Sequence, residues 1–136
     1  QAVIHLDTSF LVDLLREKGR RSVGRATRLL ESLPGEELWV SVHVACELQA
    51  GVELSQRSEA ERASVGELLG SLQIAVPTDR FPETYGHLLA YLQRRGERID
   101  TMDLLIATAA VVAGASLVTG NPRHFSRIPG LEVLTY

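Results

Sequence analysis

Short apolar runs alternate along the chain with longer stretches in which apolar residues recur at helical spacing. The short runs fall at residues 3–6, 38–42, 74–76, 116–119 and 131–134, and their β-branched and apolar residues predict strands. The spacing of i, i+3 and i+4 predicts helices at residues 7–19, 22–33, 43–53, 58–72, 82–95 and 101–113. Strands that alternate with helices predict an α/β fold, in which helices cover both faces of a mostly parallel sheet of about five strands.

Polar and turn-forming residues mark the ends of several predicted helices. The segment Asp7-Thr8-Ser9 is a cluster of N-cap residues before the first helix, and Ser58 is typical of an N-cap for the fourth. Asp100 or Thr101 is expected to open the last predicted helix. The segment Gly120-Asn121-Pro122 predicts a turn after the fourth strand.

Length and composition are typical of a globular domain, with 136 residues of which 45% are hydrophobic and 23% charged. This length suits one domain, which we expect over residues 1–136. No run of about 18 uncharged apolar residues is present, so the sequence predicts no membrane helix. One cysteine excludes an internal disulfide framework, and no secretory signal opens the sequence, so we expect a cytoplasmic location.

The net charge of −3 is unlike that of a general nucleic-acid-binding protein, which is usually basic. The cations are nevertheless unevenly distributed, because six of the fourteen lie between Arg16 and Arg28, and Lys18 is the only lysine. Arginine suits phosphate because its planar guanidinium forms two parallel hydrogen bonds. Charge alone favours a solvated, arginine-rich surface over a phosphate-binding one, and both interpretations stay open at this point.

Acidic and amide residues recur near the carboxyl ends of the predicted strands. Asp7 directly follows the first strand, Glu47 lies one helical turn after the second, and Asn121 lies two residues after the fourth. Asp103 lies in the first turn of the last predicted helix. Ligands of parallel α/β folds bind beyond the carboxyl ends of the strands, so we expect these four side chains to converge.

The chemistry that such a cluster favours is metal binding. Hard cations such as Mg²⁺ and Mn²⁺ prefer carboxylate and amide oxygens, and carboxylates without a cation would repel one another. With the metal, the cluster is suited to activate water against a phosphodiester. A metal that clamps phosphate also reconciles a negative net charge with a nucleic-acid substrate.

Each of the four residues also has a purely structural interpretation. Asp7 suits a helix cap, and Glu47 suits a solvent-facing helix position. Asp103 favours the helix dipole, and Asn121 is typical of a turn. The metal-site hypothesis therefore depends on all four lying at matching ends of successive strand–helix units.

Other chemistries receive less support from the sequence. His43, Cys46 and Glu47 offer three types of metal ligand, but no second cluster completes a zinc site, and we expect Cys46 to be a small core residue. No Gly-x-Ser-x-Gly elbow, Gly-x-Gly-x-x-Gly loop or P-loop is present. The only lysine, Lys18, does not match the lysine that follows a late strand in phosphoacceptor receiver domains.

Four segments together resemble the PIN domain family, and in particular the VapC toxins of toxin–antitoxin pairs: residues 6–9, 103–107, 117–125 and 128–131. Glu47, between Cys46 and Leu48, sits where that family has its glutamate. The resemblance covers the whole chain and implies the PIN-like α/β/α sandwich. It also implies an endoribonuclease that depends on Mg²⁺ or Mn²⁺.

The resemblance further implies which residues form the site. The implied catalytic and metal-binding residues are Asp7, Glu47, Asp103 and Asn121. Relatives have Asp or Asn at the last of these positions, and because an amide adds no charge, the number of bound metals stays open.

Residues beside the implied metal ligands match the family as well. Thr8, Ser9 and Thr119 match polar positions that hold water or phosphate. Arg123 is a candidate RNA contact, whereas we expect His124 to face water while Phe125 anchors the loop in the core.

The resemblance also implies partners. Family members act on RNA, usually form homodimers, and are inhibited by a cognate VapB-type antitoxin that occupies the active-site groove. The alternative function is a non-cleaving PIN-like binding module that acts with a partner protein or DNA, which the acidic composition and Asn121 keep open.

Overall fold

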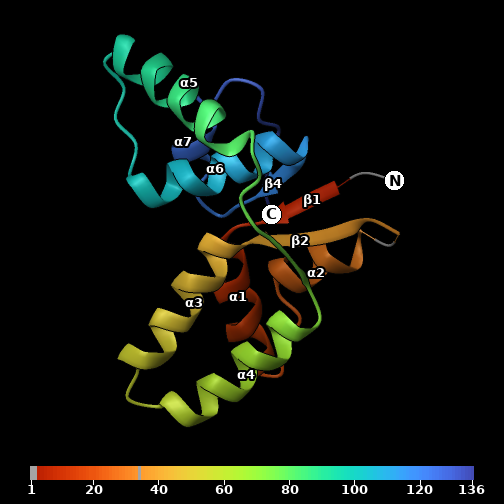
Figure 1. Ribbon diagram of the computed structural model, residues 1–136. Coiled ribbons are helices and arrows are strands. Elements are labelled where there is room, and N and C mark those ends of the chain that lie inside the picture. The colour runs from red at the N-terminus through yellow and green to blue at the C-terminus, as the bar shows by residue number, and fades with distance from the viewer. Residues whose placement is uncertain (1–2, 34) are drawn as a thin grey trace.

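The structure is a computed structural model that describes residues 3–33 and 35–136 (Figure 1). Its elements in chain order are β1 (Val3–Leu6), α1 (Thr8–Gly19), α2 (Arg25–Glu31), β2 (Glu37–Ser41), α3 (Val42–Leu54), α4 (Ser58–Gly70), β3 (Gln73–Ala75), α5 (Phe81–Arg94), α6 (Thr101–Ala113), β4 (Ser116–Val118), α7 (Pro122–Phe125) and β5 (Val133–Leu134).

The five strands form one sheet in the order β3-β2-β1-β4-β5, and every pair of neighbours is parallel. The central strand β1 places His5 opposite Trp39 of β2 and opposite Leu117 of β4. The predicted parallel sheet of about five strands is confirmed. Because all strands run the same way, their carboxyl ends meet at one edge, where the candidate residues follow them.

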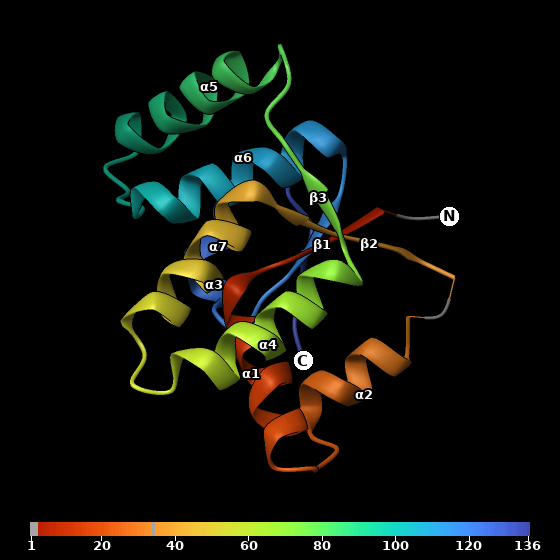
Figure 2. The same ribbon diagram turned by 60° about the horizontal axis from the view of Figure 1, so that its bottom comes forward.

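Helices cover both faces of the sheet, which confirms the α/β/α sandwich. Figure 2 shows α5 and α6 on one side of the strands and α1, α2 and α4 on the other. α3 begins directly after β2, where Ser41 accepts a hydrogen bond from the Val44 amide at 3.2 Å and so caps the helix.

The core lies between the sheet and these helices. Its largest fully buried apolar side chains come from β1, α1, α5, α6, β4 and α7: Leu6, Phe10, Leu11, Leu92, Leu104, Ile106, Leu117 and Phe125. α6 is the most deeply placed helix, since all residues from Ile106 to Ala110 are buried. The expectation that Phe125 anchors the loop after β4 is confirmed, because its side chain is fully buried.

The second helix starts at Arg25 and ends at Glu31, so the predicted span of residues 22–33 was too long. The cause is a cap from a distant residue. The Glu17 carboxylate accepts hydrogen bonds from the Gly24, Ala26 and Thr27 amides at 2.9, 3.0 and 2.9 Å. This glutamate lies outside the window of local capping rules, so the start of the helix was misplaced.

Three further local predictions were wrong. Ser58 is the first residue of α4 rather than its N-cap, which is Arg57. Cys46 is exposed and not in the core, because the buried stripe of α3 runs along Val44, Leu48 and Val52 and leaves position 46 on another face. The segment after Asn121 is a short helix, α7, rather than only a turn.

Within the described ranges, no helix is long and apolar enough to cross a membrane.

Candidate metal-binding site at the edge of the sheet

Asp7 stands where β1 ends and α1 begins. Its backbone amide donates to the Val118 carbonyl at 2.9 Å, so the neighbouring strand β4 fixes its position. The side chain is 4% exposed and makes no capping hydrogen bond. Its Oδ2 instead accepts hydrogen bonds from Thr119 Oγ1 at 2.7 Å and Ser9 Oγ at 3.0 Å. The carboxylate is therefore oriented by hydroxyl groups and does not serve as the helix cap that the sequence also allowed.

The same two hydroxyl groups join the loop after β4 to the start of α1. Ser9 Oγ accepts a hydrogen bond from the Gly120 amide at 2.9 Å, and Thr119 Oγ1 accepts one from the Asn121 amide at 2.9 Å. Gly120 permits this close approach, since a Cβ there would lie 2.8 Å from the Tyr136 hydroxyl. The sequence prediction that Ser9 and Thr119 lie beside the site agrees with this geometry.

Glu47 reaches the site from the second turn of α3. Thr8 Oγ1 donates a hydrogen bond to its Oε1 at 2.5 Å. Burial raises the pKa of Glu47 above its ordinary value, the hydrogen bond from Thr8 opposes the rise, and the charges of Asp7 and Asp103 add to it. Glu47 therefore senses both other carboxylates of the predicted set.

Asp103 lies in the first turn of α6, which begins at its N-cap Asp100, in agreement with the predicted start. Its Oδ2 lies 2.9 Å from Nδ1 of His124 on α7. Burial raises the pKa of Asp103, the His124 charge opposes the rise, and the Asp7 charge adds to it. His124 thus does not simply face water as expected: its ring is half exposed, but one edge contacts the Asp103 carboxylate.

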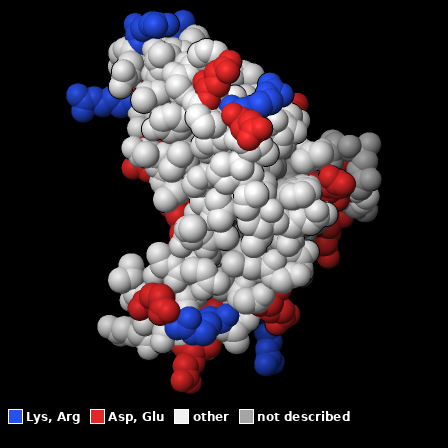
Figure 3. Space-filling view, in the orientation of Figure 1, with Lys and Arg blue, Asp and Glu red and all other residues white. Residues whose placement is uncertain are grey.

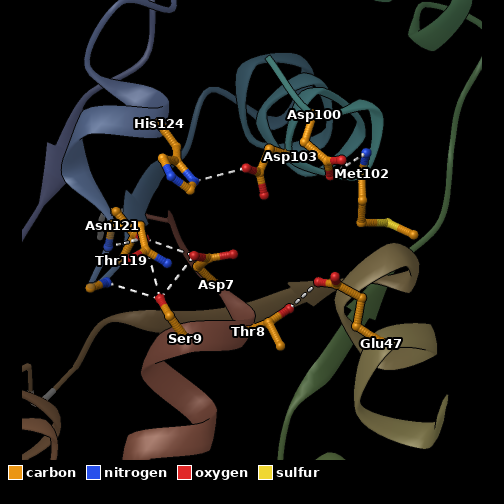
Figure 4. Close-up of polar contacts among 11 residues, drawn as sticks. Asp7, Thr8, Ser9, Glu47, Asp100, Met102, Asp103, Thr119, Asn121 and His124 are labelled. Carbon is orange, nitrogen blue, oxygen red and sulfur yellow. Dashed lines mark hydrogen bonds and ion pairs between the residues drawn. The ribbon is translucent and has the colours of Figure 1, made fainter. Parts of the chain in front are cut away.

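Figure 4 shows these side chains around one space at the carboxyl edge of the sheet. Asp7 lies at its floor, Glu47 approaches from α3 and Asp103 from α6. Asn121 lies beside Thr119 on the loop that closes the site. Arg123 is exposed on α7 and has no ion pair within residues 3–33 and 35–136.

The donor set fits a hard cation. Three carboxylates and an amide supply only oxygen ligands suited to Mg²⁺ or Mn²⁺, and the mutual repulsion of the carboxylates raises the pKa of two of them. Across the part of the chain that the structure describes, no three His, Cys, Asp or Glu side chains stand close enough to hold a metal as they are. Thr8 holds Glu47 and His124 holds Asp103, so these carboxylates must rotate away from their present partners to share a cation.

A groove adjoins the site on the side of Glu47. It measures about 500 Å³ and lies between α1, α3 and α4. Thr8 and Glu47 line one part of it, and apolar residues such as Leu15 and Val52 line the rest. A partner or substrate that enters the groove therefore meets the carboxylate cluster at one end.

Two residues of the site region escaped the interpretation of the sequence. His124 was assigned to solvent, although its place two residues after Pro122 on a helical turn allows it to face α6. Tyr136 was not considered, and its hydroxyl donates to Asp13 at 2.5 Å and to the Ser9 carbonyl at 3.4 Å. No local signal identifies this contact, because 127 residues separate Tyr136 from Ser9.

Comparison with known proteins decides the family. The PIN domain family matches residues 4–131, which is nearly the whole chain. The chain belongs to the PIN domain family. Within that family it is similar to VapC proteins. It is 33% identical over 127 residues to ribonuclease VapC19 of Mycobacterium tuberculosis, which covers 93% of this chain and 95% of that protein. It is also 37% identical over 92 residues to ribonuclease VapC2 of Rickettsia felis, which covers 68% of this chain and 69% of that protein.

Solved structures agree with this placement. The chain matches a protein of the Rickettsia felis VapBC2 complex, bound to promoter DNA, with a TM-score of 0.89, 30% identity and 98% of each chain covered. It matches VapBC-1 from nontypeable Haemophilus influenzae with a TM-score of 0.83 and 27% identity, which covers 98% of this chain and 97% of that one. This PIN domain is therefore of the VapC type that the sequence resemblance indicated.

Proposed function

We propose that this PIN domain is a metal-dependent endoribonuclease and the toxin of a VapBC-type pair. The observation that carries the proposal is the cluster of Asp7, Glu47 and Asp103, which three separate elements direct into one space at the carboxyl edge of the sheet. The names of the similar proteins, ribonuclease VapC19 and ribonuclease VapC2, support RNA as the substrate.

In the proposed site, Asp7, Glu47 and Asp103 hold Mg²⁺ or Mn²⁺, and Asn121 supplies a neutral fourth oxygen. A bound metal of this kind supplies Lewis-acid activation of water and neutralises charge on the attacked phosphodiester. Ser9 and Thr119 keep Asp7 in position through hydrogen bonds of 3.0 and 2.7 Å.

The chain's other site residues prepare the acidic pair for the cation. Thr8 and His124 hold Glu47 and Asp103 apart at the rim, and each carboxylate exchanges its partner for the metal when it binds. Arg123, exposed on α7 beside the site, is placed to contact the RNA backbone.

The proposed partners follow from the same similarity. Solved relatives are VapBC complexes, which supports a VapB-type antitoxin as partner of this chain. The groove between α1, α3 and α4 suits a partner segment with apolar side chains, and an occupant there would cover Thr8 and Glu47. A homodimer and a cytoplasmic location, where the RNA substrate is found, complete the proposal.

The experiment is a cleavage assay on total cellular RNA with purified protein, free of partner, in Mg²⁺, in Mn²⁺ and in EDTA. Asp103→Asn is the test variant, because it keeps the shape of the side chain and removes its charge. Asp79→Asn is the matched control, because Asp79 is exposed on the loop before α5.

We expect discrete fragments that need metal, persist in Asp79→Asn and vanish in Asp103→Asn. Equal cleavage by Asp103→Asn and wild type, with contamination excluded, would refute the proposed site. Metal binding and a tight partner complex without any turnover would favour the non-cleaving binding module instead.

A further inference from the structure

Four arginines form an exposed patch where α1 ends and α2 begins. We call Arg20, Arg21, Arg25 and Arg28 the arginine patch, and all four are exposed. None of them forms an ion pair with any residue in the described ranges. The one acidic residue between positions 14 and 30, Glu17, is occupied by the amides that open α2.

Cations elsewhere on the protein have acidic neighbours. Lys18 pairs with Glu67 at 2.9 Å, and Arg62 pairs with Glu53 at 3.0 Å. On the face drawn in Figure 3, several Lys and Arg side chains likewise lie directly beside Asp or Glu. The arginine patch is different, because four like charges repel one another without compensation in a protein whose net charge is −3. Such a concentration of unpaired charge indicates an anionic ligand with several charges.

The patch lies one helix length from the acidic cluster. α1 begins at Thr8, beside Asp7, and ends at Gly19, beside Arg20. Its 12 residues span about 18 Å at 1.5 Å per residue. The groove along α1 joins the two places, since Thr8 and Glu47 line it near the cluster and Arg16 and Gly19 line it near the patch.

This distance sets the size of ligand that reaches both places. At roughly 3.4 Å per phosphate along a helical strand, about 18 Å corresponds to about five nucleotides. A dinucleotide at the acidic cluster would not reach the arginines, whereas a folded RNA would.

We propose that the arginine patch is a second RNA-binding site, which grips the phosphate backbone about five nucleotides from the bond at the acidic cluster. The proposal rests on the proposed ribonuclease function and extends it to the class of substrate, an RNA long enough to span α1. The planar guanidinium groups form paired hydrogen bonds with phosphate, and several arginines together give an affinity that falls steeply with salt. Attraction at the patch offsets the repulsion between RNA and the carboxylates of the site.

The test measures RNA binding in the Asp103→Asn background, so that cleavage does not interfere. The probes are a fluorescent RNA stem-loop of about 30 nucleotides and a single strand of about four nucleotides, which is too short to span α1 at 3.4 Å per phosphate. The test variant is Arg25→Gln with Arg28→Gln, because both residues are exposed on α2 and glutamine is a good helix former. The matched control is Arg80→Gln with Arg94→Gln, which removes two exposed arginines from the other side of the sheet.

We expect the test variant to weaken binding of the stem-loop about tenfold and to reduce the salt slope of log K by about 1.4, which is 0.7 for each lost contact. Binding of the short strand, and of both RNAs to the control, should be unchanged. Equal losses in the test variant and the control would overturn the proposal, because net charge alone would then explain the effect.

Two other outcomes separate the proposal from its neighbours. Unchanged stem-loop affinity in the test variant, with lost binding of polyglutamate, would overturn the proposal and assign the patch to an acidic protein partner. If the protein with its native Asp103 cleaves no RNA but the stem-loop still binds through the patch, the ribonuclease proposal fails while the second RNA-binding site stands.

Discussion

His5 carries a testable cost of folding, because it is buried in the central strand without a polar partner. Its side chain is 1% exposed, and neither Nδ1 nor Nε2 has a hydrogen-bond partner in the described part of the chain. Burial lowers the pKa of His5 from 6.5 to about 4. The folded protein therefore holds this imidazole neutral over a pH range in which the unfolded chain protonates it.

The size and sign of the effect follow from this difference. Stability rises with pH wherever the unfolded state binds more protons, so His5 makes no penalty above pH 6.5 and costs progressively more as the pH falls to about 4. Each pKa unit is worth about 1.4 kcal/mol, which gives a loss of about 3 kcal/mol in the free energy of unfolding across this window.

The assay is urea denaturation of wild type and His5→Leu at several pH values from 7 to 4. Leucine removes both unpaired nitrogens and fills a similar volume, so at pH 7 the variant should be as stable as wild type or more stable. The difference in unfolding free energy between the two proteins should grow by about 3 kcal/mol as the pH falls. His87→Leu, at an exposed position of α5, is the control and should leave the wild-type dependence unchanged.

Parallel stability curves for wild type and His5→Leu between pH 6.5 and 4 would refute this reasoning. They would mean that His5 is protonated equally in both states, and hence that it is not sealed from solvent in the folded protein.

Three further predictions concern the site, α2 and assembly. Thr119→Val removes the hydroxyl that donates to Asp7 at 2.7 Å, and we expect cleavage to fall at least tenfold (about 1.4 kcal/mol), with rescue by Thr119→Ser in the same RNA assay. The amides and hydroxyl around Glu17, with Thr27 Oγ1 foremost, lower its pKa from 4.5 to about 2, so its contribution to stability is present above pH 4.5 and lost as the pH falls towards 2; acid titration of wild type against Glu17→Gln should show this slope only in the wild type. The homodimer implied by the family predicts twice the chain mass of 14.9 kDa in sedimentation, and a monomer at all concentrations would contradict it.

The order of elements was predictable from the sequence because each is local. Apolar runs of period suited to strands alternate with helical spacings, and this alternation sufficed for the parallel sheet and its two helical layers. The convergence of Asp7, Glu47 and Asp103 followed from topology, since parallel strands deliver whatever succeeds them to one edge.

What escaped prediction depends on contacts between distant segments. The start of α2 is set by Glu17, seven residues before Gly24, and so lies beyond the reach of local capping rules. The exposure of Cys46 reflects which stripe of α3 meets the core, and its neighbours in the chain do not reveal this. The contact between His124 and Asp103 spans 21 residues and exists because α7 packs on α6.

The most direct test of the central claim is Mn²⁺ binding, measured by calorimetry on the partner-free protein. The claim is that carboxylates from three separate elements hold one cation, so Glu47→Gln and Asp103→Asn should each weaken Mn²⁺ binding at least tenfold, while Asp79→Asn should bind as wild type does. Cleavage of RNA should be lost in the same two variants. If Mn²⁺ binds wild type and both variants equally, the carboxylates do not form a shared metal site and the proposed mechanism is wrong.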